Sequence, residues 1–264
     1  MNKPAKPLQS NAFLSWLSAE LSERMNDKLS LVKIIPSSAL EIMPRLGHGL
    51  RLLRHNYPKA KLLATPAEVG GLLNFLKNIF GKGIPSYTPV TFEPDQQLAI
   101  KDAQVELIWA STWLFAHDSA WEEDLKEWRR VLKVDGLLMF SYLGPDTGQE
   151  LRGLPNLKAV WGVDMHDMGD ALVKSGFADP VMDMEYITLT YDKKELFLKD
   201  VQSLNLFELD GQDLMLDAQI EGLKNDKGLW TLTLEVVYGH AWVVSRSQSG
   251  VATIRPEDIT IRSK

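Results

Sequence analysis

Hydrophobic residues at helical spacing open the chain. Phe13, Leu17, Leu21 and Met25 recur at every fourth position within residues 10–28. Positions four apart lie on one face of an α-helix, so the pattern predicts an amphipathic helix. Its apolar face is expected to pack against the rest of the protein.

Short apolar runs and helical patterns alternate along the rest of the chain. The apolar runs predict strands at 39–43, 61–65, 88–92, 105–110, 137–143, 181–191 and 230–244. Helical patterns between them predict helices before Tyr57 and at 68–80, 121–132, 165–175 and 193–206, while 211–226 is ambiguous. Strands that alternate with helices predict an α/β fold with a doubly wound, Rossmann-like sheet. The last two strands are expected to form an antiparallel edge.

One strand reveals how the sheet is covered. Residues 137–143 are apolar at nearly every position, so neither face of this strand can lie against water. Strands buried on both faces are typical of parallel sheets with helices on each side. Further along, Asp164 has the position of a helix N-cap and Gly176 that of a left-handed C-terminal residue. Gly239 predicts a β-bulge in the last strand.

Composition and charge narrow the class of protein. With 264 residues and 45% hydrophobic residues, one folded domain is sufficient. We expect a helical extension at 1–30, a main domain at 31–247 and a polar tail at 248–264. The net charge of −6 argues against a nucleic-acid binder, and the absence of cysteine excludes disulfides, zinc-thiolate sites and cysteine nucleophiles.

Membrane and export signals are missing from the sequence. No apolar run approaches the roughly 20 residues that span a bilayer, and the first 20 residues lack a secretory apolar core. We therefore expect a cytoplasmic protein with no membrane span.

Four phrases in the second half of the chain resemble a known enzyme family. They are LLMFSYLGPDT at 137–147, VDMHDMGD at 163–170, GFADPVMDME at 176–185 and VVYGHAW at 236–242. These stretches resemble class I S-adenosylmethionine-dependent methyltransferases, specifically relatives of the malonyl-carrier-protein O-methyltransferase of biotin synthesis. The resemblance covers about residues 10–245. It implies a seven-stranded, mostly parallel sheet and S-adenosylmethionine as the cofactor.

The family binds its cofactor with an acidic residue and glycines in the loop after the first strand, because glycines let the backbone approach the ligand. The corresponding stretch here runs from Glu41 to Gly47, and only these two residues match the family pattern. Met43 and Arg45 replace glycines, and Pro44 removes a backbone N–H between them. These replacements predict a filled or reshaped pocket.

Other cofactor contacts follow from the same alignment, which is anchored on the Tyr57-Pro58 pair. The acidic residue expected to hold the ribose falls on Pro66, and Asp95 stands one position from the acidic residue expected near the adenine. The small polar pair after the fourth strand is Ala110-Ser111. The resemblance thus implies a cofactor site made by Glu41, Gly47, Asp95, Ala110 and Ser111.

Candidate substrate contacts lie at the end of the fifth strand. Tyr142 and Asp146 are at its carboxyl end, where open α/β sheets bind ligands. An ordered loop without a ligand is the preferred interpretation. The polar cluster Asp164, His166, Asp167 and Asp170 could suggest a metal or acid/base site, but helix capping by Asp164 is the preferred interpretation. We expect no metal.

Three hypotheses of function remain open. The first is a methyltransferase acting on a carrier-linked acyl carboxylate, and the second is a pseudoenzyme, a non-catalytic relative kept as a binding or regulatory protein, with an active paralogue as one partner. The third is a different ligand in the reshaped pocket, with Arg45 recognising an anion. Five basic residues would complement the charge of an acidic partner such as the acyl carrier protein; they are Arg51, Arg54, His55, Lys59 and Lys61. A solvated helix face is the preferred interpretation of them.

Overall fold

A computed structural model describes residues 12–44, 47–65, 84–93, 97–111, 121–154, 157–159, 162–204, 207–209 and 214–245. Several predictions fall outside these residues. They are the helix at 68–80, the contacts of Asp95, the replacements at Arg45 and Pro66, and the tail at 248–264.

Seven strands form one mixed sheet in the order β3-β2-β1-β4-β5-β9-β7. The strands are β1 (Ser38–Glu41), β2 (Lys61–Ala64), β3 (Thr88–Pro89), β4 (Val105–Ala110), β5 (Leu132–Leu143), β7 (Ala178–Tyr191) and β9 (Trp230–Trp242). Strands β1 to β5 pair in parallel, and β9 runs antiparallel to both β5 and β7. The predicted Rossmann-like sheet with an antiparallel edge is confirmed.

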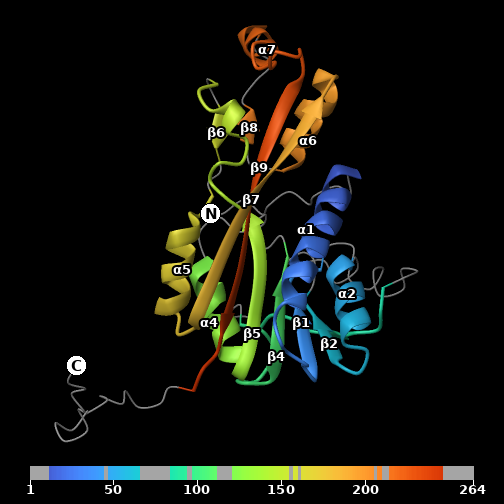
Figure 1. The fold of residues 1–264 in the computed structure, drawn as a ribbon, viewed down its shortest axis with the longest axis vertical. Helices are drawn as coiled ribbons and strands as arrows, with labels where there is room; N and C mark the ends of the chain where they lie inside the picture. The colour runs from blue at the N-terminus through green and yellow to red at the C-terminus, as the bar shows by residue number, and fades with distance from the viewer. Residues whose placement is uncertain are drawn as a thin grey trace, which may run out of the picture.

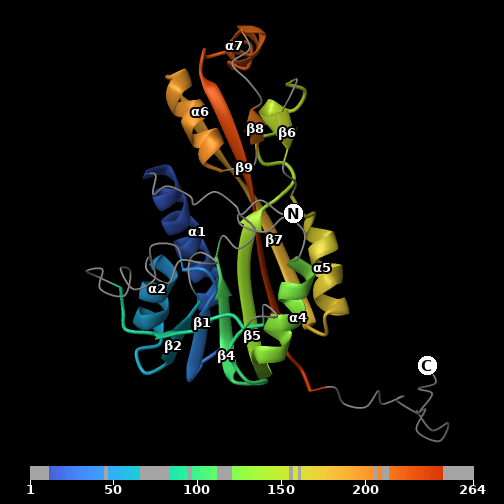
Figure 2. The ribbon, with the colours of Figure 1, turned by 180° about the vertical axis from the view of Figure 1, so that it is seen from behind.

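Helices cover both faces of the sheet (Figures 1 and 2). On one face lie α1 (Ala12–Ser30) and α2 (His48–Asn56), and on the other lie α4 (Trp121–Val131) and α5 (Met165–Lys174). Each face has its own hydrophobic cluster, with Leu21 and Trp109 buried in the first and Leu125 and Phe140 buried in the second. The strand at 137–143 is buried along its length, as its composition predicted.

The hairpin of β7 and β9 extends beyond the main sheet and carries a small lobe (Figure 1). This lobe contains α6 (Lys194–Ser203), α7 (Leu214–Glu221) and a ribbon of β6 (Leu157–Ala159) and β8 (Phe207–Leu209). Trp230 fixes it, since its indole N–H donates to the carbonyl of Ile220 and its ring stacks on Phe197. The ambiguous stretch at 211–226 thus contains α7.

The first helix is part of the core. Leu17, Leu21 and Met25 of α1 are at most 1% exposed and belong to the cluster that contains β1 and β4. Ion pairs from Arg24 to Glu185 and from Lys28 to Asp183, both at 2.5 Å, join α1 to the outer strand β7.

The predicted bulge at Gly239 is wrong. Gly239 pairs in register with Phe140, and a Cβ at Gly239 would overlap the Phe140 ring, so close packing explains this glycine. The register shift of the hairpin lies instead in β7, between Ala178 and Val181, where Asp179 has a φ of 49°. The sequence signal for a bulge was a glycine, but the extra residue is in the partner strand.

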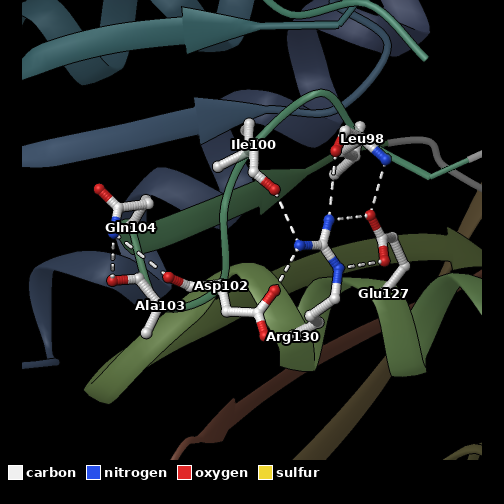
Figure 3. Close-up of polar contacts among 7 residues, drawn as sticks. All are labelled: Leu98, Ile100, Asp102, Ala103, Gln104, Glu127 and Arg130. Atoms are coloured by element: carbon white, nitrogen blue, oxygen red, sulfur yellow. Dashed lines mark hydrogen bonds and ion pairs between the residues drawn. The ribbon is translucent and has the colours of Figure 1, made fainter. Parts of the chain in front are cut away.

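Arg130 of α4 anchors the segment that leads into β4 (Figure 3). Its guanidinium donates to the carbonyls of Leu98 and Ile100 and pairs with Asp102 and Glu127. Three acceptors on this segment, the carbonyls of Leu98 and Ile100 and the Asp102 carboxylate, hold it against α4. The contact fixes the approach to the amino end of β4.

Candidate cofactor and substrate site

The loop between β1 and α2 keeps a glycine-type backbone at a residue that is not glycine. Met43 has a φ of 48° and Gly47 a φ of 68°. A left-handed conformation costs a residue with a Cβ about 1–2 kcal/mol. The amide of Met43 donates to Thr65 Oγ1 at 2.7 Å, in the buried interior, which helps to hold this conformation.

The side chain of Met43 is buried beside the first crossover. It is 6% exposed and belongs to the cluster on the face covered by α4 and α5, together with Val90, Leu98 and Ala110. The prediction that Met43, Pro44 and Arg45 fill or reshape the cofactor pocket stays a prediction. Arg45 and Leu46 lie outside the described residues.

Glu41 ends β1 and points to the start of α2. Its carboxylate accepts hydrogen bonds from the backbone N–H groups of Gly49 and Leu50, which are two of the unsatisfied donors at the helix start. Burial raises the pKa of Glu41 to about 8 despite these donors and the charge of Arg51. Its Oε2 atom is buried without a hydrogen-bond partner. The side chain therefore caps α2, a role that was not predicted from the sequence.

Gly49 and Trp109 surround the Glu41 carboxylate, and sequence analysis missed both. A Cβ at Gly49 would overlap the carboxylate of Glu41 and the indole of Trp109. Trp109 is 0% exposed, pairs with Glu41 across the sheet, and leaves its indole N–H without a partner. The only sequence signal was the second glycine at the start of a helix.

The two residues after β4 that were expected to contact cofactor have contacts within the protein. Ala110 is 0% exposed in the core. Ser111 lies 3.1 Å from Ser22 of α1, Oγ to Oγ, in a buried contact. Gly47 adjoins Ile84, whose side chain would contact a Cβ placed there. Asp95 lies outside the described residues.

The two substrate candidates occupy different environments. Tyr142 is 0% exposed, and its hydroxyl has no hydrogen-bond partner. Asp146 is open to solvent, pairs with Arg152 at 2.5 Å and accepts a hydrogen bond from the Tyr186 hydroxyl at 3.0 Å. Glu235 lies between them: its carboxylate accepts the backbone N–H of Asp146.

Glu235 was not identified from the sequence. It stands in β9 with an exposure of 6%, among apolar neighbours. Burial raises its pKa, and the nearby carboxylates of Asp146 and Asp164 add to the effect, against the backbone N–H of Asp146. An acidic residue inside an apolar strand was the available signal.

The polar clusters give no metal site within the described part of the chain. Asp164 caps α5 by accepting the backbone N–H of His166 at 2.8 Å, and Asp167 and Asp170 are exposed, so the capping interpretation is confirmed.

No helix in the described residues has the length and apolarity needed to cross a bilayer. No family model matches the chain. Its sequence is 36% identical over 253 residues to the malonyl-[acyl-carrier protein] O-methyltransferase of Laribacter hongkongensis, covering 86% of this chain and 82% of the relative. The enzyme of the same name from Gallionella capsiferriformans is 35% identical, with 86% and 83% covered.

The fold has a close counterpart among solved structures. The YcgJ protein from Bacillus subtilis superposes with a TM-score of 0.60 at 13% identity, over 84% of this chain and 99% of that one. This likeness supports the fold, and the sequence relatives support the family. The chain belongs to the malonyl-[acyl-carrier protein] O-methyltransferase family.

Proposed function

We propose that this chain is a methyltransferase of the malonyl-carrier-protein type whose S-adenosylmethionine site is impaired. Its relatives and the fold imply that cofactor, and the relatives' name implies an acyl carrier protein as the bearer of the acceptor. The observation that carries the proposal is the buried side chain of Met43, in a left-handed conformation, at a position where the family expects glycine.

The described residues fit the methionine end of that cofactor poorly. A glycine at position 43 would leave room for ligand beside the backbone, whereas the Met43 side chain packs into the core. The Glu41 carboxylate accepts hydrogen bonds from the backbone of α2, and the Ser111 hydroxyl is hydrogen-bonded with that of Ser22. Binding would require these groups to exchange existing partners, at a cost in affinity.

The second candidate is an active methyltransferase, and one observation favours it. Met43 and Gly47 both have the left-handed backbone that is typical of glycine, which supports a loop of the family's kind at these two positions. When bound, the cofactor would supply an electrophilic methyl group, and the chain's task would be to position the acceptor. In that case Tyr142 and Asp146 remain the proposed substrate contacts.

Calorimetric titration with S-adenosylmethionine and S-adenosylhomocysteine separates the two candidates. We expect no binding by the wild type up to millimolar ligand. The variant Met43→Gly should gain at least about tenfold in affinity, because it reopens the space beside the loop. Met168→Ala, a comparable loss of a buried methionine in α5, is the matched control and should gain nothing.

Two results would overturn the proposal. Micromolar binding by the wild type would establish a working cofactor site despite Met43. If Met43→Gly also failed to bind either ligand, while thermal unfolding showed that the variant is folded, the Met43 side chain would not be what prevents binding.

We also propose a partner and a cellular location for the chain. Of the basic residues considered for carrier docking, Arg54 donates to the carbonyls of Pro58, Ala60 and Ser86 and so is used inside the protein. His55 and Lys59 are exposed and support a docking role for an acidic carrier or a paralogue. The absence of cysteine supports a cytoplasmic location.

A further inference from the structure

The carboxyl edge of β5 holds a group of acidic side chains around one buried hydroxyl. Glu235 forms the floor at 6% exposure, and Gly144 makes room for it, because a Cβ at Gly144 would overlap the Glu235 carboxylate. The backbone N–H of Asp146 donates to Glu235 Oε2 at 2.5 Å. One oxygen of a buried carboxylate is thus held in place by the loop that follows β5.

The rim of this niche is acidic and open to solvent. Asp164, at the start of α5, has a side chain that is 52% exposed, and Asp146 has one that is 38% exposed. Asp167 follows in the first turn of α5. Gly162 packs directly on the backbone of Gly144, so the two segments that carry the rim lie against each other.

Tyr142 supplies the second, independent observation. Its side chain is 0% exposed, and its hydroxyl has no hydrogen-bond partner. The carboxylates of Asp164, Glu235 and Asp167 are close enough to raise the pKa of Tyr142 further, beyond the larger effect of burial. A buried hydroxyl without a partner costs about 1–3 kcal/mol, so a ligand that satisfies it would recover that loss.

The chemistry of the niche selects the kind of ligand. Four carboxylates face it, and Arg152 neutralises Asp146 by an ion pair. Within the described residues no set of side chains suits a metal ion. An organic cation with several N–H donors could satisfy both the carboxylate of Glu235 and the oxygen of Tyr142.

We propose that the niche of Glu235, Tyr142, Asp164 and Asp146 binds a primary ammonium group of a small molecule. The ammonium donates to Glu235 and Tyr142 on the floor and is stabilised by the charge of Asp164 on the rim. This site shares Tyr142 and Asp146 with the substrate contacts proposed for an active enzyme, but an ammonium ligand is no part of that function. The niche lies across β4 and β5 from Glu41 and does not depend on whether S-adenosylmethionine binds.

Calorimetry with n-butylammonium chloride tests the proposal at constant ionic strength, with n-butanol as the uncharged analogue. We expect a Kd on the order of 1 mM for the ammonium and no binding of the alcohol. Glu235→Gln and Asp164→Asn should each weaken binding about fivefold, because each removes one charge and keeps its hydrogen-bond acceptor. Tyr142→Phe should weaken it as well.

The matched control is Glu195→Gln, which removes an exposed charge on α6, far along the chain from the niche. This variant should bind n-butylammonium as the wild type does. Equal heats for the ammonium and the alcohol would overturn the proposal. So would wild-type affinity in both Glu235→Gln and Asp164→Asn, or equal losses in Glu195→Gln, since binding would then follow net charge and not this niche.

Discussion

The energetic cost of the left-handed backbone at Met43 can be measured as the difference in stability between two substitutions. Replacing Met43 by Ala removes a buried side chain but leaves a Cβ at a φ of 48°. Replacing it by Gly removes the Cβ too and relieves the strain. Comparing Gly with Ala at this position therefore isolates the backbone conformation.

Three contributions set the difference in stability between the Gly and Ala variants, and they partly cancel. Gly loses one buried methyl group relative to Ala, about 0.8 kcal/mol, and a further 0.5–1 kcal/mol, roughly, in backbone entropy. Glycine also avoids the cost of the left-handed conformation, which stabilises the Gly variant relative to the Ala variant by about 1–2 kcal/mol. We expect Met43→Gly and Met43→Ala to have free energies of unfolding within about 0.8 kcal/mol of each other, both below the wild type by about 2–5 kcal/mol.

Met168 provides the control, because it is equally buried but lies within the helix α5. There Gly should be about 2 kcal/mol less stable than Ala, since no strain is relieved. Urea denaturation of the four variants gives the comparison directly. The Gly variant could instead be less stable than the Ala variant by the same free energy of unfolding at positions 43 and 168. In that case the backbone strain assigned to Met43 would be absent.

Four other changes test separate contacts. Tyr142→Phe should raise the free energy of unfolding by about 1 kcal/mol, because it removes a buried hydroxyl without a partner; a loss in urea denaturation would mean the hydroxyl is satisfied. Arg130→Met should cost about 2 kcal/mol, as it leaves two carbonyls without their charged donor; a loss below about 0.5 kcal/mol would contradict this. Gly239→Ala should cost about 1–3 kcal/mol through overlap with Phe140, and Phe140→Leu should recover part of that cost in the double variant. The pKa of Glu41 is raised to about 8, so the folded protein retains a proton that the unfolded chain loses; stability should fall by up to about 1.4 kcal/mol per pH unit as the pH rises from 5 to 8, and Glu41→Gln should flatten this profile.

The main sheet and its helices were predictable from the sequence because their elements carried local signals, whereas β6, β8 and α7 of the small lobe were not predicted. The apolar run at 137–143 predicted a strand buried on both faces, and Asp164 predicted the start of α5. Gly239 shows the limit of such signals. A glycine can serve a bulge or a close side-chain contact, and only the position of Phe140 across the sheet decides between them.

The candidate site was predictable only in part, because its residues were compared with a family pattern one position at a time. The pattern identified Met43 and Glu41 but not their conformations. It also missed Glu235, whose importance comes from the loop at Gly144 that lies 91 positions earlier in the sequence. Contacts between distant segments leave no spacing that a sequence pattern can reveal.

The conformation of Met43 bears on how this loop departed from the family pattern. A methionine that had simply rebuilt the loop would have relaxed to an ordinary φ, because nothing local favours the left-handed region for a side chain of this kind. At Met43 the backbone instead has a φ of 48°, and the hydrogen bond from the Met43 amide to Thr65 Oγ1 helps to hold it there. The surrounding structure therefore maintains a conformation that glycine adopts at no steric cost, and we propose that the Met43 side chain reduces the space beside it. A single substitution at position 43 is for that reason the most direct way to learn whether the space still accepts a ligand.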